Sequence, residues 1–184
     1  MRHEHILKKE KALLLVIDYQ EKLLAAFNDT EELLQNCAKL IKFAKILKLP
    51  ILWTEQYPKG LGKTVEEVSK ELSRLKPVEK LSFSCFGEPA FVEQLSRHSS
   101  TQLMLCGIET HICVEQTALD AVNAGYQVHI VADACASRKI HDHHIGLRKM
   151  EGAGALVTCT EMAMYEILGR SDVPEFREVL KIVK

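Results

Sequence analysis

Three side chains in this sequence have the chemistry for nucleophilic catalysis: the carboxylate of Asp18, the ammonium group of Lys80 and the thiol of Cys113. A carboxylate can take the proton of a thiol, while an ammonium group can orient that carboxylate and stabilise a thiolate. Cys113 is predicted at or near the first turn of a helix, where unpaired N–H groups and the helix dipole favour a thiolate. We therefore predict that Cys113 is the nucleophile.

Each of the three residues also has a simpler interpretation. Asp18 could cap a turn, Lys80 could be a solvated surface lysine, and Cys113 could be a buried packing residue. The catalytic interpretation rests on their shared position, because all three are predicted at the ends of strands. Cys85 is a second candidate nucleophile, but it follows a short strand and no helix begins there.

The elements that must position these residues follow from apolar runs that alternate with helical patterns. Residues 11–17 lead up to Asp18 as an apolar run, which is typical of a strand buried on both faces of a parallel sheet. Five more strands are predicted over residues 49–54, 77–80, 101–106, 126–132 and 154–158. Helices are predicted over residues 29–47, 64–75, 88–97, 112–124, 140–151 and 161–168, with an amphipathic segment over residues 173–184.

This alternation predicts βαβ units with right-handed crossovers. We expect one α/β domain over residues 1–184, with three α/β/α layers around a six-stranded parallel sheet. Such sheets bind ligands beyond the carboxyl ends of their strands. Asp18, Lys80 and Cys113 are predicted at that edge, after the first, third and fourth strands.

The composition argues against several classes of partner. Lys and Arg total 24 against 25 for Asp and Glu, and this net charge of -1 gives no reason to expect a nucleic acid or a membrane surface. No run approaches the ~20 apolar residues that span a bilayer, and the polar first residues do not resemble a signal sequence. We expect a cytoplasmic protein whose six cysteines are free thiols.

The motifs around the three residues resemble those of a known family. Val-Ile-Asp18-Tyr-Gln, Glu-Lys80 with Phe-Ser-Cys-Phe behind it, and Gly-Ile-Glu-Thr-His-Ile-Cys113 are similar to motifs of the isochorismatase-like cysteine hydrolases. The resemblance covers nearly the whole chain, and residues 107–121 carry its most specific motif. It implies the strand order 3-2-1-4-5-6 and a triad of Asp18, Lys80 and Cys113. It also implies a cis peptide bond between Ile108 and Glu109, and an oxyanion hole formed by the N–H groups of Glu109 and Cys113.

The reaction that the resemblance implies is acyl transfer to a thiol. Asp18 deprotonates Cys113, the thiolate attacks an amide-like carbonyl of a small molecule, and ammonia or an amine leaves. Water activated by Asp18 then hydrolyses the thioester, while Lys80 keeps Asp18 oriented. The expected activity is that of an amidohydrolase.

Departures from relatives indicate the metal-free branch of this family. Nicotinamidases carry an Asp-x-His pair and a later His around a divalent metal, whereas this chain has Glu55 and Tyr57 in place of the pair. No histidine lies between His5 and His98. We therefore expect no catalytic metal and no cofactor, and we disfavour nicotinamide as the substrate. True isochorismatases lack the cysteine, so Cys113 argues against vinyl-ether hydrolysis.

The walls of the substrate pocket are predicted on loops at the same edge. Four residues are expected to border the cleft, although each could equally be a core or surface residue: Tyr19, Trp53, Gln56 and Phe83. His111 either touches the substrate or packs against its own loop. The histidines within residues 141–144 do not predict a metal site, because consecutive residues on a helix point in different directions.

Two other functions stay open at this point. The chain could be an interaction or scaffold protein with an idle triad, or a thiol-reactive redox protein that uses Cys113 without hydrolysis. The predicted partner is a small-molecule substrate, and the resemblance implies a homo-oligomer. The sequence determines neither the natural substrate nor the role of residues 173–184.

Overall fold

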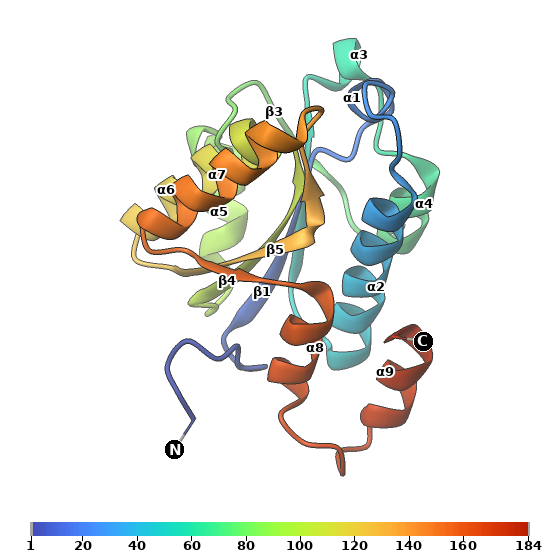
Figure 1. The fold of residues 1–184 in the computed structure, drawn as a ribbon, viewed down its shortest axis with the longest axis vertical. Helices are drawn as coiled ribbons and strands as arrows, with labels where there is room; N and C mark the ends of the chain where they lie inside the picture. Colours follow the sequence, from blue (N-terminus) through green and yellow to red (C-terminus); the bar gives the residue numbers. More distant parts are fainter. Residues whose placement is uncertain (1, 184) are drawn as a thin grey trace.

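The computed structural model describes residues 2–183 and confirms a parallel sheet in the order β3-β2-β1-β4-β5-β6. The strands are β1 (Ala12–Ile17), β2 (Ile51–Gln56), β3 (Val78–Lys80), β4 (Gln102–Ile108), β5 (Gln127–Ala136) and β6 (Leu156–Thr158). Helices lie on both sides of the sheet, so the three-layer α/β/α architecture is also confirmed (Figure 1).

Two groups of helices cover the two faces. The α2 face lies under α2 (Glu31–Leu47), α8 (Thr160–Leu168) and α9 (Phe176–Val183). The α6 face lies under α5 (Pro89–Ser96), α6 (Glu115–Asn123) and α7 (Ile140–Gly152). Side chains alternate along β1, so Leu14 and Val16 enter the α2 core while Leu15 and Ile17 enter the α6 core. Burial on both faces explains the continuous apolar run.

Three short helices follow β1 and β2: α1 (Glu21–Leu24), α3 (Pro58–Leu61) and α4 (Glu66–Ser69). The sequence did not predict α1 or α3. The helix predicted over residues 64–75 is shorter, because α4 continues only as the 3₁₀ turn Lys70–Leu72. In Figure 1, α1 and α3 lie at the top of the molecule, and α4 lies beside α2.

Two central strands are longer than predicted. β4 continues through Gly107, where β1 comes so close that an added Cβ would lie 2.5 Å from the carbonyl oxygen of Ile17. β5 continues to Ala136 after an irregularity in its pairing with β4. Asp133 is therefore inside a strand rather than beyond one, and its carboxylate accepts the N–H of Thr160 at 2.8 Å where α8 begins.

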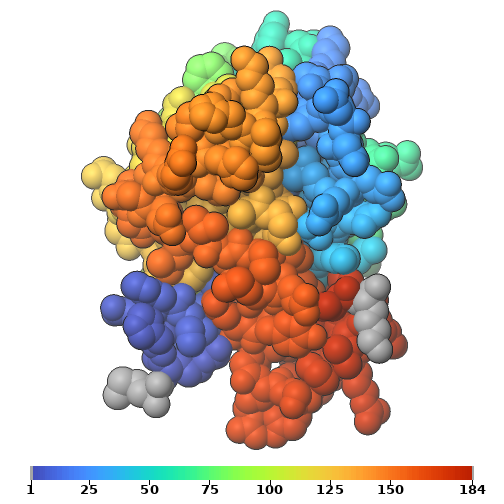
Figure 2. Space-filling model, viewed as in Figure 1, coloured from blue at the N-terminus to red at the C-terminus, as the bar shows by residue number. Residues whose placement is uncertain are grey.

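The C-terminal segment packs on its own chain. Helix α9 lies beside α2 (Figure 1), and Val179 is fully buried there. The space-filling view shows the blue α2 segment lying against the orange and red C-terminal part of the chain (Figure 2). Lys184 of the predicted segment lies outside the described residues. Within residues 2–183, no helix has both the length and the apolar character needed to cross a bilayer.

Candidate active site

The carboxyl edge of the sheet brings together the two charged residues that the sequence singled out. Asp18 directly follows β1, Lys80 ends β3, and β2 lies between these strands. The Nζ atom of Lys80 lies 2.7 Å from Oδ2 of Asp18, and both side chains are completely buried. A charged pair without access to water requires hydrogen bonds to all its polar atoms, and the surrounding residues supply them.

Asp18 is held from both sides. The hydroxyl of Thr54, on the neighbouring strand β2, donates a 2.7 Å hydrogen bond to Oδ1, while Lys80 occupies Oδ2. The backbone of Asp18 is left-handed, with φ at 56°, which residues other than glycine adopt only where the surroundings impose it. The carboxylate therefore has a fixed orientation at the end of β1.

Lys80 has four oxygen acceptors around its ammonium group: Oδ2 of Asp18, Oε1 of Gln56, and the carbonyl oxygens of Ser82 and Phe83. Burial lowers the pKa of Lys80, but the charge and hydrogen bond of Asp18, together with the two neighbouring thiols, outweigh burial and the net pKa is raised. The ammonium form is therefore the stable one. The alternative of a solvated surface lysine is wrong.

Cys113 lies beside this pair as a neutral thiol. Only 6% of the residue is exposed, and burial, followed by the charge of Asp18, raises the pKa of Cys113 to about 12. Lys80 acts in the opposite direction and lowers this pKa. The prediction that the helix start stabilises a thiolate is therefore wrong. Desolvation and the neighbouring carboxylate favour the neutral thiol and outweigh the effect of the helix start.

The segment that carries Cys113 also differs from the predicted helix start. The residues from Thr110 to Val114 form a π-helical turn, here called the Cys113 turn, and regular α6 begins only at Glu115. Its wide hydrogen bond runs from the N–H of Val114 to the carbonyl oxygen of Glu109 at 3.3 Å. The peptide bond between Ile108 and Glu109 is cis. π-Helical turns are rare and occur frequently at functional sites.

Glu109, predicted to contribute its backbone N–H, directs its side chain away from the pair. Both carboxylate oxygens bond to Arg138, one of them also to the Arg138 backbone N–H at 2.8 Å. This ion pair neutralises a carboxylate that is otherwise buried. The negative charge of Glu109 is therefore held by Arg138, on the loop after β5.

The second candidate thiol, Cys85, lies in the same group. It is fully buried, its N–H donates a 3.0 Å hydrogen bond to the hydroxyl of Thr117, and burial followed by Asp18 raises its pKa to about 12. Thr117 is four residues after Cys113, which places the two thiols over the same side of α6. Since Cys85 has no exposed surface, Cys113 is the better placed nucleophile.

The predicted pocket residues divide into three groups. Tyr19 and Trp53 are buried in the core under α2, on the other face of the sheet from Cys113, and the Tyr19 hydroxyl bonds to the carbonyl oxygen of Ala134. Their placement on cleft-lining loops is wrong, because both point into the α2 core. Gln56 is the last residue of β2, not part of a loop, and its side chain accepts a hydrogen bond from Lys80. Phe83 is 54% exposed.

His111, on the Cys113 turn, is held by residues that follow β5. Its Nδ1 lies 2.8 Å from the hydroxyl of Ser137, and its Nε2 lies 3.9 Å from a carboxylate oxygen of Asp142. A quarter of its side chain is exposed. Packing against the loop is thus observed, and the exposed part remains open to a ligand.

Glu55, which stands where the resemblance would place the acid of a metal site, has a structural role here. One carboxylate oxygen of Glu55 accepts both the N–H and the hydroxyl of Thr64, each at 2.8 Å, so this acid fixes the loop after α3. Among the described residues, no group of three His, Cys, Asp or Glu side chains is arranged to hold a metal ion. Glu55 is therefore a loop-fixing residue.

The structure adds two residues that the sequence analysis missed, Thr54 and His143. Thr54 lies one residue after Trp53 and so points to the opposite face, where Asp18 and Cys113 lie. His143 belongs to the histidine cluster, and its Nδ1 lies 2.8 Å from the hydroxyl of Thr110 on the Cys113 turn. Alternation along β2 could have indicated Thr54, but no sequence signal links His143 to Thr110.

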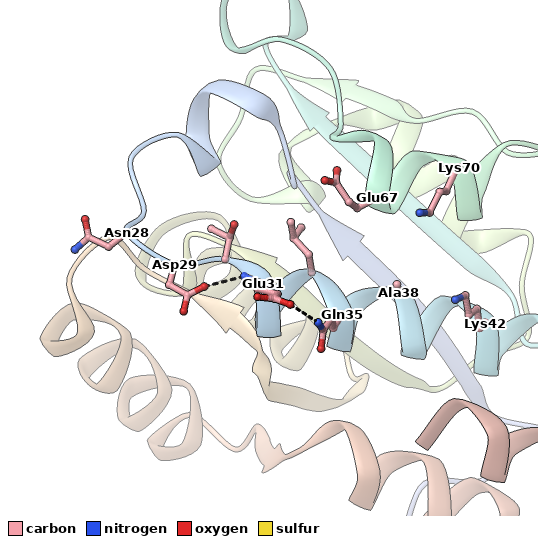
Figure 3. Close-up of a pocket in the computed structure, with 10 residues that line it drawn as sticks. Asn28, Asp29, Glu31, Gln35, Ala38, Lys42, Glu67 and Lys70 are labelled. Carbon is pink, nitrogen blue, oxygen red and sulfur yellow. Dashed lines mark hydrogen bonds between the residues drawn. The ribbon is translucent and has the colours of Figure 1, made fainter. Parts of the chain in front are cut away.

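The larger cavities lie away from this group. One of about 890 Å³ opens at the amino end of β2, and one of about 570 Å³ lies between α2 and α4. The second cavity is lined by Asp29, just before α2, by Glu31 and Gln35 in its first turns, and by Glu67 and Lys70 on the segment across from them (Figure 3). Smaller cavities of about 300 and 210 Å³ border Lys80 and His111. The largest cavities and the group of buried reactive residues therefore lie at different places in the molecule. The buried reactive residues are the stronger indication of function.

Comparison with known proteins identifies the family. Residues 12–162 match the model of the isochorismatase domain, a range that includes Asp18, Lys80 and Cys113. The chain belongs to the isochorismatase domain family. It is 38% identical to isochorismatase domain-containing protein 2A of Mus musculus over 176 residues, which cover 95% of this chain and 84% of the relative.

Solved structures of isochorismatase-like proteins agree with this fold. A protein described as the MAR1 ribonuclease from Caenorhabditis elegans is 36% identical, with a TM-score of 0.89 over 97% of this chain and 92% of that one. The YcaC gene product from Escherichia coli, described as an octameric hydrolase of unknown specificity, has a TM-score of 0.87 over 98% of this chain and 97% of that one. Since the latter is 22% identical, it supports the fold alone.

Proposed function

We propose that this isochorismatase-like protein is a hydrolase that cleaves an amide-like C–N bond of a small molecule, with Cys113 as the nucleophile. The observation that carries the proposal is the fully buried pair of Asp18 and Lys80 beside a thiol at the edge of the sheet. Isolated burial of charges is unfavourable, so a buried pair next to a reactive group points to chemistry.

Proton transfer from Cys113 to Asp18 begins the reaction. The raised pKa of Cys113 keeps its proton on sulfur at rest, so the proton moves as the sulfur attacks the carbonyl carbon. Lys80 and Thr54 hold the two carboxylate oxygens in place during this transfer. Lys80 also supplies the positive charge that favours a thiolate next to it.

The carbonyl oxygen becomes negative when the carbon–sulfur bond forms. We propose that the backbone N–H groups of Glu109 and Cys113 bind this oxyanion, which is worth several kcal/mol when donors are fixed in advance. The pairing of Glu109 with Arg138 supports this, since it keeps a buried carboxylate from facing the developing charge. The Asp18 proton then passes to the leaving nitrogen, the C–N bond breaks, and an acyl thioester of Cys113 remains.

Water completes the cycle. Asp18, again a carboxylate, takes a proton from water as its oxygen attacks the thioester, and the Cys113 sulfur leaves and recovers the proton. The products are a carboxylic acid and ammonia or an amine. The mechanism that we propose needs no metal, and Glu55 is already bound to Thr64.

The test combines turnover with thiol labelling. Ammonia release from a panel of small amides is compared between the wild type and Cys113→Ala, and the rate of Cys113 alkylation by iodoacetamide is measured from pH 6 to 10. We expect hydrolysis that is lost in both Cys113→Ala and Asp18→Asn. Alkylation should be faster in Asp18→Asn than in the wild type, because the Asp18 carboxylate raises the pKa of Cys113. Cys106→Ala is the matched control, since Cys106 is a fully buried thiol in the α2 core.

Each alternative has its own outcome in this test. Fast alkylation of Cys113 without turnover of any amide would favour a redox protein, and slow alkylation without turnover would favour a scaffold. A short RNA is included because the Caenorhabditis elegans relative is described as a ribonuclease. Cleavage of RNA without cleavage of amides would overturn the C–N assignment.

We also propose that the protein is a cytoplasmic homo-oligomer. The fold neighbour from Escherichia coli is described as octameric, and exposed apolar side chains such as Leu81 and Phe83 are available for contact between copies. Light scattering of the purified protein measures the mass directly. A mass near 20.8 kDa, that of one chain, would contradict this proposal.

A further inference from the structure

We propose that helix α7 positions the Cys113 turn for catalysis, through a close backbone contact at Gly146 and a hydrogen bond between His143 and Thr110. This inference rests on the proposed function and deepens it, because it assigns positioning roles to residues that touch neither substrate nor the reacting atoms. Helix α7 packs against the Cys113 turn along its first two turns, where His143 and Gly146 lie.

Gly146 lets the two backbones approach. A Cβ added at Gly146 would lie 3.1 Å from Cα of His111, 3.3 Å from N of His111 and 3.2 Å from the carbonyl oxygen of Thr110. All three distances are shorter than ordinary Cβ contacts, and all three atoms belong to main chain. Alanine at this position would therefore displace the Cys113 turn by a few tenths of an ångström.

His143 fixes the same turn with a polar contact. Its Nδ1 lies 2.8 Å from the hydroxyl of Thr110, and both side chains are buried. Burial and the neighbouring His144 lower the pKa of His143, so a neutral ring is favoured at pH 7. A neutral imidazole offers one donor and one acceptor, which matches the hydroxyl of Thr110.

A third contact prevents the turn from rotating about these two. His111, between Thr110 and Cys113, is held at Nδ1 by Ser137, on the loop that leads from β5 into α7. The turn is thus held at both of its first two residues by elements that follow β5. π-Helical turns are rare and occur frequently at functional sites, so contacts that hold this one in place bear directly on Cys113.

The position of the Cys113 turn determines two distances that the proposed reaction needs. Cys113 is the fourth residue of the turn and must reach Asp18, while the N–H of Glu109 directly precedes the turn and must reach the oxyanion. Misplacement of reacting groups by 1 Å can lower a rate roughly 100-fold. A shift of a few tenths of an ångström is then expected to lower it roughly three- to tenfold.

The experiment compares two glycines on the same helix. Gly146→Ala places its Cβ against the Cys113 turn, whereas Gly152→Ala, at the exposed end of α7, places its Cβ where no heavy atom lies within 4 Å. Alanine favours a helix more than glycine does, so neither change is expected to lower the unfolding midpoint through the backbone. We expect kcat of Gly146→Ala to fall roughly three- to tenfold with an unchanged KM, and Gly152→Ala to match the wild type.

The hydrogen bond is tested by a rescue series. Thr110→Val removes the hydroxyl at nearly equal volume, and Thr110→Ser retains it. His143→Asn keeps a polar group close to the place of Nδ1, whereas His143→Leu does not. We expect Thr110→Val and His143→Leu to lower kcat roughly tenfold, and Thr110→Ser and His143→Asn to recover most of it. Equal kcat values for Thr110→Val and Thr110→Ser would overturn the role of this bond.

The rate of Cys113 alkylation separates this inference from the proposed function. Alkylation requires the thiol but no amide substrate, and its rate depends on how Cys113 lies relative to Asp18 and Lys80, which shift its pKa in opposite directions. It therefore reports the position of the turn even in a protein without amidase activity. An alkylation rate of Gly146→Ala that differs from that of Gly152→Ala supports the inference, whatever the panel of amides shows. Equal alkylation rates and equal kcat values in these two variants would overturn the role of Gly146. A wild type that hydrolyses none of the amides would overturn only the proposed function.

Discussion

Replacing Lys80 by methionine tests the most consequential feature of the site, the charged pair without access to water. The substitution keeps an unbranched side chain of similar length and removes the ammonium group. Asp18 then stays in the interior with Thr54 as its remaining charge-neutral partner, and Oε1 of Gln56 loses its donor. We expect a large loss of stability as well as loss of activity.

The magnitude follows from burial. Breaking a buried ion pair from one side costs about 3–5 kcal/mol, because the other charge remains uncompensated. Both side chains of this pair are 0% exposed, and their 2.7 Å separation permits no intervening water. A domain of this size is stable by about 5–15 kcal/mol, so the variant should fold but unfold at much lower urea.

The assay is urea unfolding at pH 7.5, with Lys45→Met as the matched control. Lys45 also makes a short ion pair, with Glu71 at 3.0 Å, but its side chain is 47% exposed. Exposed pairs contribute about 0–1 kcal/mol, so the two substitutions should differ several-fold in cost. Equal costs for Lys80→Met and Lys45→Met would refute the reasoning that burial determines the energy.

A double variant guards against general damage to the core. Asp18→Asn combined with Lys80→Met removes both charges and retains the hydrogen bond from Thr54, so it should be more stable than Lys80→Met alone. We expect a coupling energy of at least about 2 kcal/mol. Additive losses would show that packing around Lys80, and not its charge, stabilises the fold.

Two further predictions concern neighbours of this pair. Thr54→Val should lower the free energy of unfolding in urea by about 1.5–3 kcal/mol and lower kcat at least roughly tenfold, because a buried carboxylate loses a hydrogen-bond donor. Thr54→Ser keeps the hydroxyl and should behave like the wild type. A valine variant with normal kcat would contradict the role of Thr54. Cys85 and Cys113 have pKa values of about 12 in the folded protein, against 9.0 as the ordinary value, so they stabilise the fold below pH 9 and this contribution is lost as the pH rises from 9 towards 12. Unfolding free energies at pH 7.5 and 10 should therefore differ less in Cys85→Ala than in the wild type, and an equal difference would contradict the raised pKa of Cys85.

Faces of strands explain which pocket predictions failed. Val16 and Trp53 are paired neighbours in the sheet, and both point into the α2 core, while Thr54 points to the side of Asp18 and Cys113. Successive side chains of a strand point to opposite faces of the sheet. An error of one residue in the assumed alternation therefore places every side chain on the wrong face. The sequence indicated that β2 reaches the site, but it did not indicate which of its side chains enter it.

The amino-acid sequence by itself determined the parallel sheet and the residues at its carboxyl edge. A strand buried on both faces must be continuously apolar, so Asp18 marks the point where β1 leaves the core, while Lys80 is the last residue of the short edge strand β3. The tertiary structure alone decided the state of Cys113. Its pKa depends on its burial and on its distance from Asp18, which follows β1, far away in the sequence. The same is true of the contacts of the Cys113 turn with His143 and Gly146, because residues more than thirty positions apart in the sequence meet only when α7 packs on the sheet.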